Sequence, residues 1–403
     1  MLLKQIIDNP QMSLLYMERY VNNGSPSGFT WINQTSNDTS PLGGKEYFFL
    51  DRLCVEDKIE VIGDIPTFFD LLGNNSIFIH PDMRKLYSKK GLQIQKSCIR
   101  VSPLSSSRTV KLLDFSGYVK LNYNGIIGRI DRSLTDRHAY FSVEMTEYLR
   151  NALKKSIYSK LAFFPEPGAI VYRNEDLNIG MVYRDENVSG KNVNRIKYII
   201  PMFSSFSNDK NATDDTLIIQ LIKKSQKKPD EYILNNLIFT IIDNYFNLLL
   251  NEGIQPEWHA QNLLLGIDDD YSIVALIMRD LESIDIDQSL QESIGIRKLF
   301  KSYPYKYLNN NQYNYQIKHS FMYDFKIGEY IFKPIIKCVS EYYNLREEMF
   351  ERKIKEYSKQ YIEKLPKDFF PIDGSWYSFE KVLIDRSISK RPYIKNKGVK
   401  YRG

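Results

Sequence analysis

The sequence predicts an α+β fold, with a β-rich segment followed by a mainly helical one. Between residues 76 and 205, short runs rich in Val, Ile, Tyr and Phe alternate with turn residues, which is typical of strands. From residue 206 onward, longer stretches have the apolar spacing of helices. The 403 residues, 43% of them hydrophobic, are enough for two or three units with cores of their own.

The first segment, residues 1–75, is expected to form a small region of its own. Residues 1–22 have helical spacing. Residues 24–44 are rich in Ser, Thr, Asn, Gly and Pro and are expected to form a loop. The run SIFIHP that follows this region is expected to be a strand ending at His80 and Pro81.

The middle segment, residues 76–205, is expected to be a β-rich unit with one helix. Ser116 and Gly117 predict a tight hairpin turn between two of its strands. The expected strands are 99–101, 110–115, 118–123, 169–173, 179–184 and 198–203, and the expected helix is 143–156.

The last segment, residues 206–403, is expected to be mainly helical. The expected helices are 214–224, 229–253, 288–300 and 330–361. Gly253 is a usual helix terminator. The very apolar run 232–250 contains five Asn and Asp residues, which favours a buried amphipathic helix over a membrane span.

The net charge and the cysteine content limit the class of protein and its expected location. The net charge is +6, and residues 389–403 alone carry six Lys and Arg side chains with no acid. Such a tail favours a solvated end, or a strap over an anionic ligand, more than nucleic-acid binding.

Cys54, Cys98 and Cys338 are far apart, which favours a reducing, cytoplasmic location without disulfides or a zinc site. Lys4 and Asp8 interrupt the first apolar run, so no signal peptide is expected.

A predicted hairpin between residues 253 and 287 gathers polar side chains at its open end. His259, Gln261 and Asn262 precede the first strand, and Asp280 and Glu282 follow the second. On an extended segment, residues two apart point to one face, so both carboxylates are expected to lie together. Paired carboxylates suit Mg²⁺, which also binds nucleotide phosphates. A polar hairpin end without a ligand is the alternative interpretation.

A second group of polar residues surrounds the earlier hairpin. Hydroxyl side chains at 105–107 are followed by Arg108 and Thr109, and Lys120 lies in the facing strand. Hydroxyls, backbone N–H groups and two cations can hold a polyphosphate. One of Arg129, Arg132 and Arg137 could clamp a substrate carboxylate through two parallel hydrogen bonds. A Ser-rich turn with solvated arginines is the simpler alternative.

The order of these motifs resembles a known family. The shared residues are Ser106, Arg108, Thr109, Lys120, Arg132, Glu166, His259, Gln261, Asn262, Asp280 and Glu282. Their order is similar to that in the aerobactin-synthetase (IucA/IucC) family, siderophore synthetases that act without a peptide-synthetase assembly line (NIS synthetases). The text GIQPEWHAQN and an HP pair before S-x-R-T carry the resemblance over about residues 76–290.

The resemblance implies a cupped-hand architecture with an N-terminal thumb, β-rich fingers and a helical, kinase-like palm. It implies that ATP and Mg²⁺ adenylate a carboxylic acid, citrate or a related polycarboxylate. An amine or a hydroxyl then displaces AMP, as in siderophore or related metallophore biosynthesis. The product would be an amide or an ester.

The resemblance also implies roles for individual residues. Ser106, Arg108, Thr109 and Lys120 would hold the ATP phosphates, with Gln261 and Asn262 at the nucleotide. Asp280 and Glu282 would lie near Mg²⁺. His259 and Arg132 would face the acid, with Glu166 on the substrate side and Lys120 also taking part in catalysis.

The sequence departs from the family pattern in two places. The segment before S-x-R-T is short, so a reduced thumb is expected, and a homodimer or a partner synthetase could supply missing contacts. Gly128 stands where the family usually has Thr, which removes a hydroxyl from the substrate side. Both departures bear on the substrate more than on the ATP chemistry.

Two other functions fit parts of this pattern. A kinase-like phosphotransferase would need a catalytic Asp in the loop that here carries Gln261. A scaffold of the same family that binds an active partner would fit the short N-terminal region. No binding to nucleic acid or membrane is expected.

Overall fold

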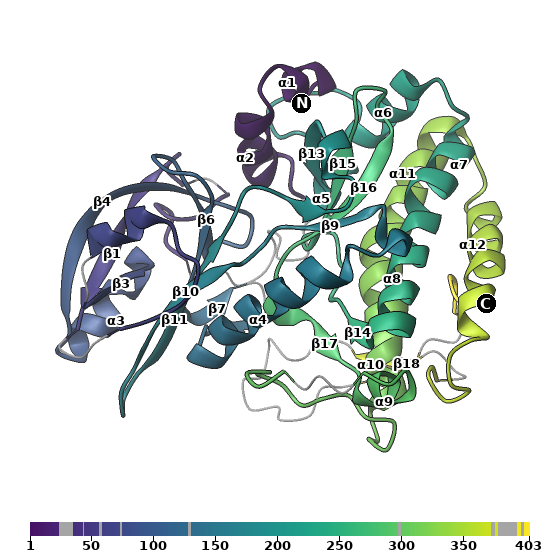
Figure 1. Ribbon diagram of the computed structural model, residues 1–403. Coiled ribbons are helices and arrows are strands. Elements are labelled where there is room, and N and C mark those ends of the chain that lie inside the picture. The colour runs from purple at the N-terminus through teal and green to yellow at the C-terminus, as the bar shows by residue number, and fades with distance from the viewer. Residues whose placement is uncertain are drawn as a thin grey trace.

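The structure is a computed structural model of the 403-residue chain. It describes residues 1–23, 35–42, 44–55, 59–72, 75–127, 130–296, 300–371, 375–377, 393–395 and 399–403. Most of the loop predicted at 24–44 lies outside this range, and so does Gly128. The described residues form an α+β fold, as the sequence predicted, and most of their strands lie in two sheets (Figure 1).

The larger sheet has eight strands, all paired antiparallel, in the order β2-β10-β11-β6-β5-β4-β1-β3. Its strands are β1 Phe48–Cys54, β2 Glu60–Gly63, β3 Ser76–Ile79, β4 Gln93–Pro103, β5 Thr109–Leu112, β6 Tyr118–Leu121, β10 Gly168–Arg173 and β11 Asn178–Arg184. The predicted hairpin of β10 and β11 is confirmed. One face of the sheet packs on its own apolar core with α3, Arg84–Lys89.

The turn between β5 and β6 differs from the prediction. The strands pair Thr109 with Lys120, but β5 ends at Leu112, so five residues connect the strands instead of a tight turn at Ser116-Gly117. Side chains outside the hairpin hold this longer loop, because Asp114 pairs with Arg100 of β4. Gly117 has a φ of 93°, a conformation that glycine adopts without strain.

The smaller sheet has five strands in the order β12-β9-β16-β15-β13. They are β9 Leu161–Phe163, β12 Ser189–Gly190, β13 Tyr198–Pro201, β15 Leu263–Ile267 and β16 Ile273–Met278. The predicted β15–β16 hairpin is confirmed, and β9 pairs with β16 in parallel. The middle segment, 76–205, therefore supplies strands to both sheets. The division of the chain at residues 75 and 205 remains a prediction.

Three short strand pairs complete the β structure that is described. The strands are β7 Tyr123–Ile127 with β8 Ile130–Arg132, β14 Ile254–Gln255 with β17 Asp285–Ile286, and β18 Ser375–Tyr377 with β19 Tyr393–Lys395. The first pair places Arg132 directly opposite Tyr123. It continues the chain from β6 toward α4, Asp136–Ala152.

Helices cover the smaller sheet and form the second, larger core (Figure 1). They are α5 Met202–Ser205, α6 Leu217–Ser225, α7 Pro229–Glu231, a π-helical turn Tyr232–Ile238, α8 Phe239–Glu252, α9 Gln288–Ser293, α10 Tyr315–Ser320, a π-helical segment Phe321–Phe332, α11 Lys333–Tyr343 and α12 Glu347–Ile362. Among the described residues, one helix, Pro229–Glu252, has the length and hydropathy of a membrane span. Its apolar side chains Ile241, Ile242 and Tyr245 are fully buried in this core, as predicted.

Several predicted helices have different bounds. The helix expected at 143–156 is α4, which begins seven residues earlier, at Asp136, and ends at Ala152. The helix expected at 330–361 is divided into α11 and α12, because Asn344 adopts the left-handed conformation, with a φ of 52°. The helix expected at 1–22 is divided into α1 Leu3–Asp8 and α2 Pro10–Tyr20. Proline lacks the N–H that would continue α1, and the Asn9 side chain caps α2 by accepting the Met12 N–H. The helix expected at 288–300 ends at Ser293 in α9.

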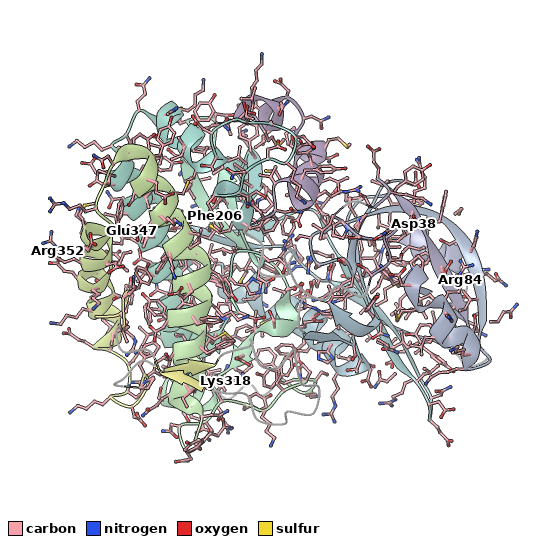
Figure 2. All side chains as sticks on the ribbon, turned by 180° about the vertical axis from the view of Figure 1, so that it is seen from behind. Asp38, Arg84, Phe206, Lys318, Glu347 and Arg352 are labelled. Atoms are coloured by element: carbon pink, nitrogen blue, oxygen red, sulfur yellow. The ribbon has the colours of Figure 1, made fainter. Side chains whose placement is uncertain are left out.

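The larger sheet with its core forms one lobe of the molecule, and the smaller sheet with its helices forms the other. Figure 2 shows Arg84 and Asp38 on the lobe of the larger sheet, and Glu347 and Arg352 of α12 at the opposite side. The described end of the basic tail packs on the helical lobe, where Arg402 pairs with Asp324 at 3.2 Å and Lys400 with Glu351 at 3.0 Å.

Candidate active site

A buried network of ion pairs lies where the two sheets meet. The Nζ atom of Lys120, on β6, lies 2.8 Å from Asp280 Oδ1 and 2.9 Å from Glu282 Oε1. Arg108 Nη2, just before β5, lies 2.6 Å from the same Glu282 oxygen. The two cations come from the larger sheet, and the two carboxylates follow β16 of the smaller sheet. The network thus brings together residues that the sequence assigned to the phosphate and the metal sites.

Arg184, at the end of β11, extends this network. Its Nη2 atom lies 2.6 Å from both Asp280 Oδ1 and Glu166 Oε1. Its Nε also donates to Glu166 Oε1, at 3.0 Å. Glu166 is fully buried and holds the guanidinium behind Asp280. Glu166, predicted on the substrate side, is thus linked to the site through Arg184.

The segment that carries the two acids is a tight turn and is not extended, so that expectation was wrong. Asp280 has a left-handed backbone with φ 69° and ψ 61°, and Leu281–Ser283 forms a 3₁₀ turn. Asp tolerates this conformation better than most residues because its short side chain bonds locally. The turn brings both carboxylates to Lys120, although the backbone does not alternate.

Neighbouring cations hold both carboxylates in the charged form. Burial alone would raise the pKa of Asp280, but the charges of Lys120, Arg184 and Arg108 outweigh burial and hold it well below its usual range. Burial likewise opposes the ionisation of Glu282. Lys120 and Arg108 nevertheless lower the pKa of Glu282 to about 2. Because each of the three cations Arg108, Lys120 and Arg184 already contacts a carboxylate, an added polyanion would compete with these acids for the cations.

The Ser-rich loop before β5 is compact. The Ser106 hydroxyl accepts the Thr109 N–H at 3.3 Å, and the Ser107 N–H donates to Leu104 O at 2.8 Å. Ser107 has a φ of 64°, in the left-handed region. Backbone conformations of this kind persist only where the surrounding structure fixes them, and they cluster at functional sites. The loop holds Arg108 and Thr109 in place at the start of the strand.

The segment 259–262 faces this loop from the smaller sheet. His259 Nδ1 accepts the Gln261 N–H at 3.2 Å, and Asn262 Nδ2 donates to Glu257 O at 3.2 Å. Gln261 Nε2 donates to Ser105 Oγ at 3.2 Å. The Gln261 side chain therefore joins the two loops, whereas the Asn262 side chain bonds within its own segment. The place of both residues at a nucleotide stays a prediction.

His259 and Arg132 lie among further charged groups near Asp280. Burial, with the charge of Lys326, lowers the pKa of His259 to about 3. Burial and the charge of Arg108 lower the pKa of Arg132. The main-chain oxygen of Arg132 accepts a hydrogen bond from Arg108 Nη1 at 3.0 Å, so Arg132 is joined to the ion-pair network.

Three charged residues of this site were not predicted from the sequence. Arg184 stands in the strand IGMVYRDE, and Glu257 stands in GIQPEWHAQN, both within the stretches that carry the family resemblance. Lys326 lies in the π-helical segment Phe321–Phe332, and no sequence motif marks it. Its Nζ atom lies 2.8 Å from Glu257 Oε1. Arg184 could have been inferred because it lies within residues 76–290, over which the resemblance holds, whereas Lys326 lies outside that range.

A cavity of about 200 Å³ adjoins the ion-pair network. Its walls are mainly apolar and come from both sheets, with Leu104 and Tyr118 on one side and Phe164, Ile199 and Leu264 on the other. Arg184 and Arg279 also line it. Arg184 also contacts Asp280, so this residue links the cavity to the charged cluster.

The carboxylates fit a hard divalent cation that is shared with a substrate. Within the described residues, no group of three or more His, Cys, Asp and Glu side chains is placed to hold a metal alone. Asp280 and Glu282 supply two carboxylates. No described residue forms a hydrogen bond with Glu282 Oε2. Mg²⁺ usually binds through one or two carboxylates and completes its shell with waters and substrate phosphates.

The lowered pKa of His259 predicts a pH-dependent stability. The unfolded chain binds a proton on this side chain below about pH 6.5, whereas the folded chain binds it only near pH 3. The free energy of unfolding should therefore fall as the pH is lowered from 6.5. The His259 contribution to this fall is about 2 kcal/mol by pH 4.5. Denaturant titrations of wild type and His259→Gln at pH 7 and 4.5 measure it. Equal pH dependence in the two proteins would contradict the lowered pKa.

Comparison with known proteins identifies the fold. No family model and no curated protein matches the sequence. Among solved structures, the petrobactin biosynthesis protein AsbB from Bacillus anthracis matches 87% of this chain and 67% of its own, with TM-score 0.65 and 14% identity. The aerobactin synthetase IucC from Klebsiella pneumoniae matches 85% and 68%, with TM-score 0.63 and 12% identity. The ATP-bound aerobactin synthetase IucA from the same species matches 98% and 80%, with TM-score 0.66 and 11% identity. The fold predicted from the motif order is therefore confirmed.

Proposed function

We propose that this chain, which has the fold of the NIS synthetases, is an ATP-dependent ligase that adenylates a carboxylic acid. An amine or alcohol then captures the acyl-adenylate. The observation that carries the proposal is the meeting of Arg108, Lys120, Asp280 and Glu282 in one buried cluster beside an apolar cavity. A nucleoside triphosphate has the same two parts, a flat base with apolar faces and a polyanion that needs cations and a metal.

In this proposal the base occupies the cavity and the phosphates extend toward the cluster. Tyr118 and Leu264 come from opposite sheets, so they can cover the two faces of a planar ring. Arg184 lines the cavity and reaches Asp280, so it lies along the path from the base to the phosphates. Arg108 and Lys120 then balance the phosphate charge in place of the carboxylates that they contact here.

The carboxylates released from these cations would hold Mg²⁺, which neutralises phosphate charge as the reaction proceeds. Glu282 is buried and Asp280 is partly buried, and both are ionised, so they are ready to bind a cation without first losing a proton. Adenylation needs this neutralisation because the acid and the α-phosphoryl group are both negative.

The carboxylic acid would bind beside His259 and Arg132, with Lys326 adding a further cation. A carboxylate oxygen attacks the α-phosphorus, the bond to the β-phosphate oxygen breaks, and pyrophosphate leaves. The nucleophile then attacks the acyl carbon, AMP leaves, and the nucleophile loses a proton. His259 is neutral at pH 7, and its Nδ1 atom accepts the Gln261 N–H, so its Nε2 carries the proton and can donate a hydrogen bond to the acid.

A wider side chain in the cavity should weaken ATP binding. Ile199, on β13, lines the cavity, and Ile199→Trp is expected to raise the Kd for Mg-ATP at least about tenfold because its ring occupies the space for the base. Tyr198 is its neighbour on the strand and packs on the main core instead, so Tyr198→Trp is the matched control. Calorimetric titration measures both. An unchanged Kd for Mg-ATP in Ile199→Trp would show that the base does not bind in this cavity.

A panel of carboxylic acids tests the rest of the proposal. The purified chain is incubated with ATP, Mg²⁺ and hydroxylamine, which captures an activated acyl group as a hydroxamate. We expect hydroxamate with one polycarboxylate, citrate or a related acid, and little with monocarboxylates. ATP binding without hydroxamate from any acid would favour a scaffold or a requirement for a partner synthetase.

A further inference from the structure

A closed ring of hydrogen bonds joins α2 to the three loops of the site. Glu18 Oε2, on α2, accepts the Ser105 N–H at 3.1 Å and the Ser105 Oγ–H at 2.6 Å. Glu18 Oε1 accepts Arg279 Nη1 at 2.6 Å. Arg279 Nε donates to Gln261 O at 2.7 Å, and Gln261 Nε2 donates to Ser105 Oγ at 3.2 Å. All four side chains are buried, and Glu18 has no exposed surface.

Each loop residue of this ring is the direct neighbour of a proposed site residue. Ser105 precedes Ser106 of the phosphate loop, Gln261 precedes Asn262, and Arg279 precedes Asp280. The larger sheet supplies the first loop, and the smaller sheet supplies the other two. Glu18 therefore fixes the position of the phosphate loop relative to the turn that carries the carboxylates.

The helix that carries Glu18 also forms one wall of the cavity. Leu14 and Leu15 line the cavity together with Glu18. Figure 1 shows α2 beside the smaller sheet, close to the junction with the larger one, and α2 contacts β13. The same helix therefore closes the cavity through Leu14 and Leu15 and reaches both loops through one carboxylate.

We propose that Glu18 is a positioning residue of the nucleotide site, and that α2 couples closure of the cavity to the arrangement of the phosphate and metal loops. The inference rests on the proposed function, because the ligand of the cavity is taken to be ATP. Glu18 touches no phosphate or metal in this account. It acts through Ser105 and Arg279 on the residues that do.

A carboxylate is needed at this position for a reason of hydrogen-bond chemistry. The two donors of Ser105 approach one oxygen, and the guanidinium of Arg279 approaches the other. In Glu18→Gln, one of these oxygens becomes an NH₂ group, which faces a donor whichever way the amide is turned. The variant keeps the volume of the side chain and breaks one side of the ring.

Two measurements on the full chain test the inference, with Met12→Ala as the control. Met12 lies on the same helix, has 59% of its surface exposed and is absent from the cavity lining. We expect Glu18→Gln to raise the Kd for Mg-ATP about tenfold. We also expect faster hydrogen exchange in the peptide 104–109 without ligand. Either the Ser105 N–H loses its acceptor, or Arg279 on the other side of the ring loses its acceptor and the ring opens there. Met12→Ala should change neither quantity.

The outcomes separate this inference from the proposed function. If wild type binds Mg-ATP and Glu18→Gln binds it equally well, the positioning role is wrong. If wild type binds no ATP, the proposed function is wrong, and exchange in peptide 104–109 then decides whether Glu18 orders the loop. Unchanged exchange in Glu18→Gln would overturn the inference in either case. A lowered unfolding temperature with unchanged Kd and exchange would show a role in stability alone.

Discussion

Replacing Arg108 with alanine is expected to reduce acid-dependent release of pyrophosphate about a hundredfold to a thousandfold. Arg108 lies at the junction of the sheets and supplies a forked cation that can hold phosphate oxygens through two parallel bonds. The fold should remain, because Glu282 keeps Lys120 as a partner at 2.9 Å. A coupled assay of pyrophosphate at saturating acid measures the loss, and the unfolding temperature confirms that the protein is folded.

The matched control for this variant is Arg100→Ala. Arg100, on β4 of the same sheet, pairs with Asp114 at the surface, where ion pairs contribute little to stability. Pyrophosphate release by this control should equal that of wild type. If folded Arg108→Ala releases pyrophosphate at the wild-type rate, Arg108 does not hold the phosphates.

Asp280→Asn is expected to abolish Mg²⁺-dependent turnover, with a loss of about a thousandfold. Asn adopts the left-handed conformation almost as readily as Asp, so the φ of 69° at this position costs little more. Neither cation is left without a carboxylate, since Lys120 keeps Glu282 and Arg184 keeps Glu166. The variant should therefore fold while its metal site loses one charge.

Asp268→Asn is the control at the other end of the same hairpin. Asp268 Oδ1 accepts the N–H groups of Asp270 and Ser272, and the amide oxygen of Asn can accept both. Titration of Mg²⁺ against turnover compares the two variants. An unchanged Mg²⁺ dependence in Asp280→Asn would assign the metal to other residues.

The residues that the sequence brought together correctly are those on local strand pairs. Lys120 was expected near Arg108 because the two flank one hairpin, and the register of Thr109 with Lys120 bears this out. His259 and Asp280 were expected to meet because the β15–β16 hairpin joins their segments. Pairing within a hairpin is set by nearby residues, so two strand-like runs joined by a turn predict it.

The residues that the sequence did not indicate depend on contacts between distant segments. Glu18 and Arg279 are 261 positions apart, and no repeat or spacing connects them. Lys326 comes from a π-helical segment, Phe321–Phe332, that lies mostly before the helix expected at 330–361. The left-handed turn at Asp280 follows from the fit between the two sheets, which hold its carboxylate against Lys120 and Arg184.

The identity of the nucleotide product is the most direct test of the account. The purified chain is incubated with ATP, Mg²⁺ and the acid that gives a hydroxamate, and the products are separated by anion-exchange chromatography. The account predicts AMP and pyrophosphate in equal amounts, formed only when the acid is present. Formation of ADP with a phosphorylated acid would contradict it and would identify a phosphotransferase.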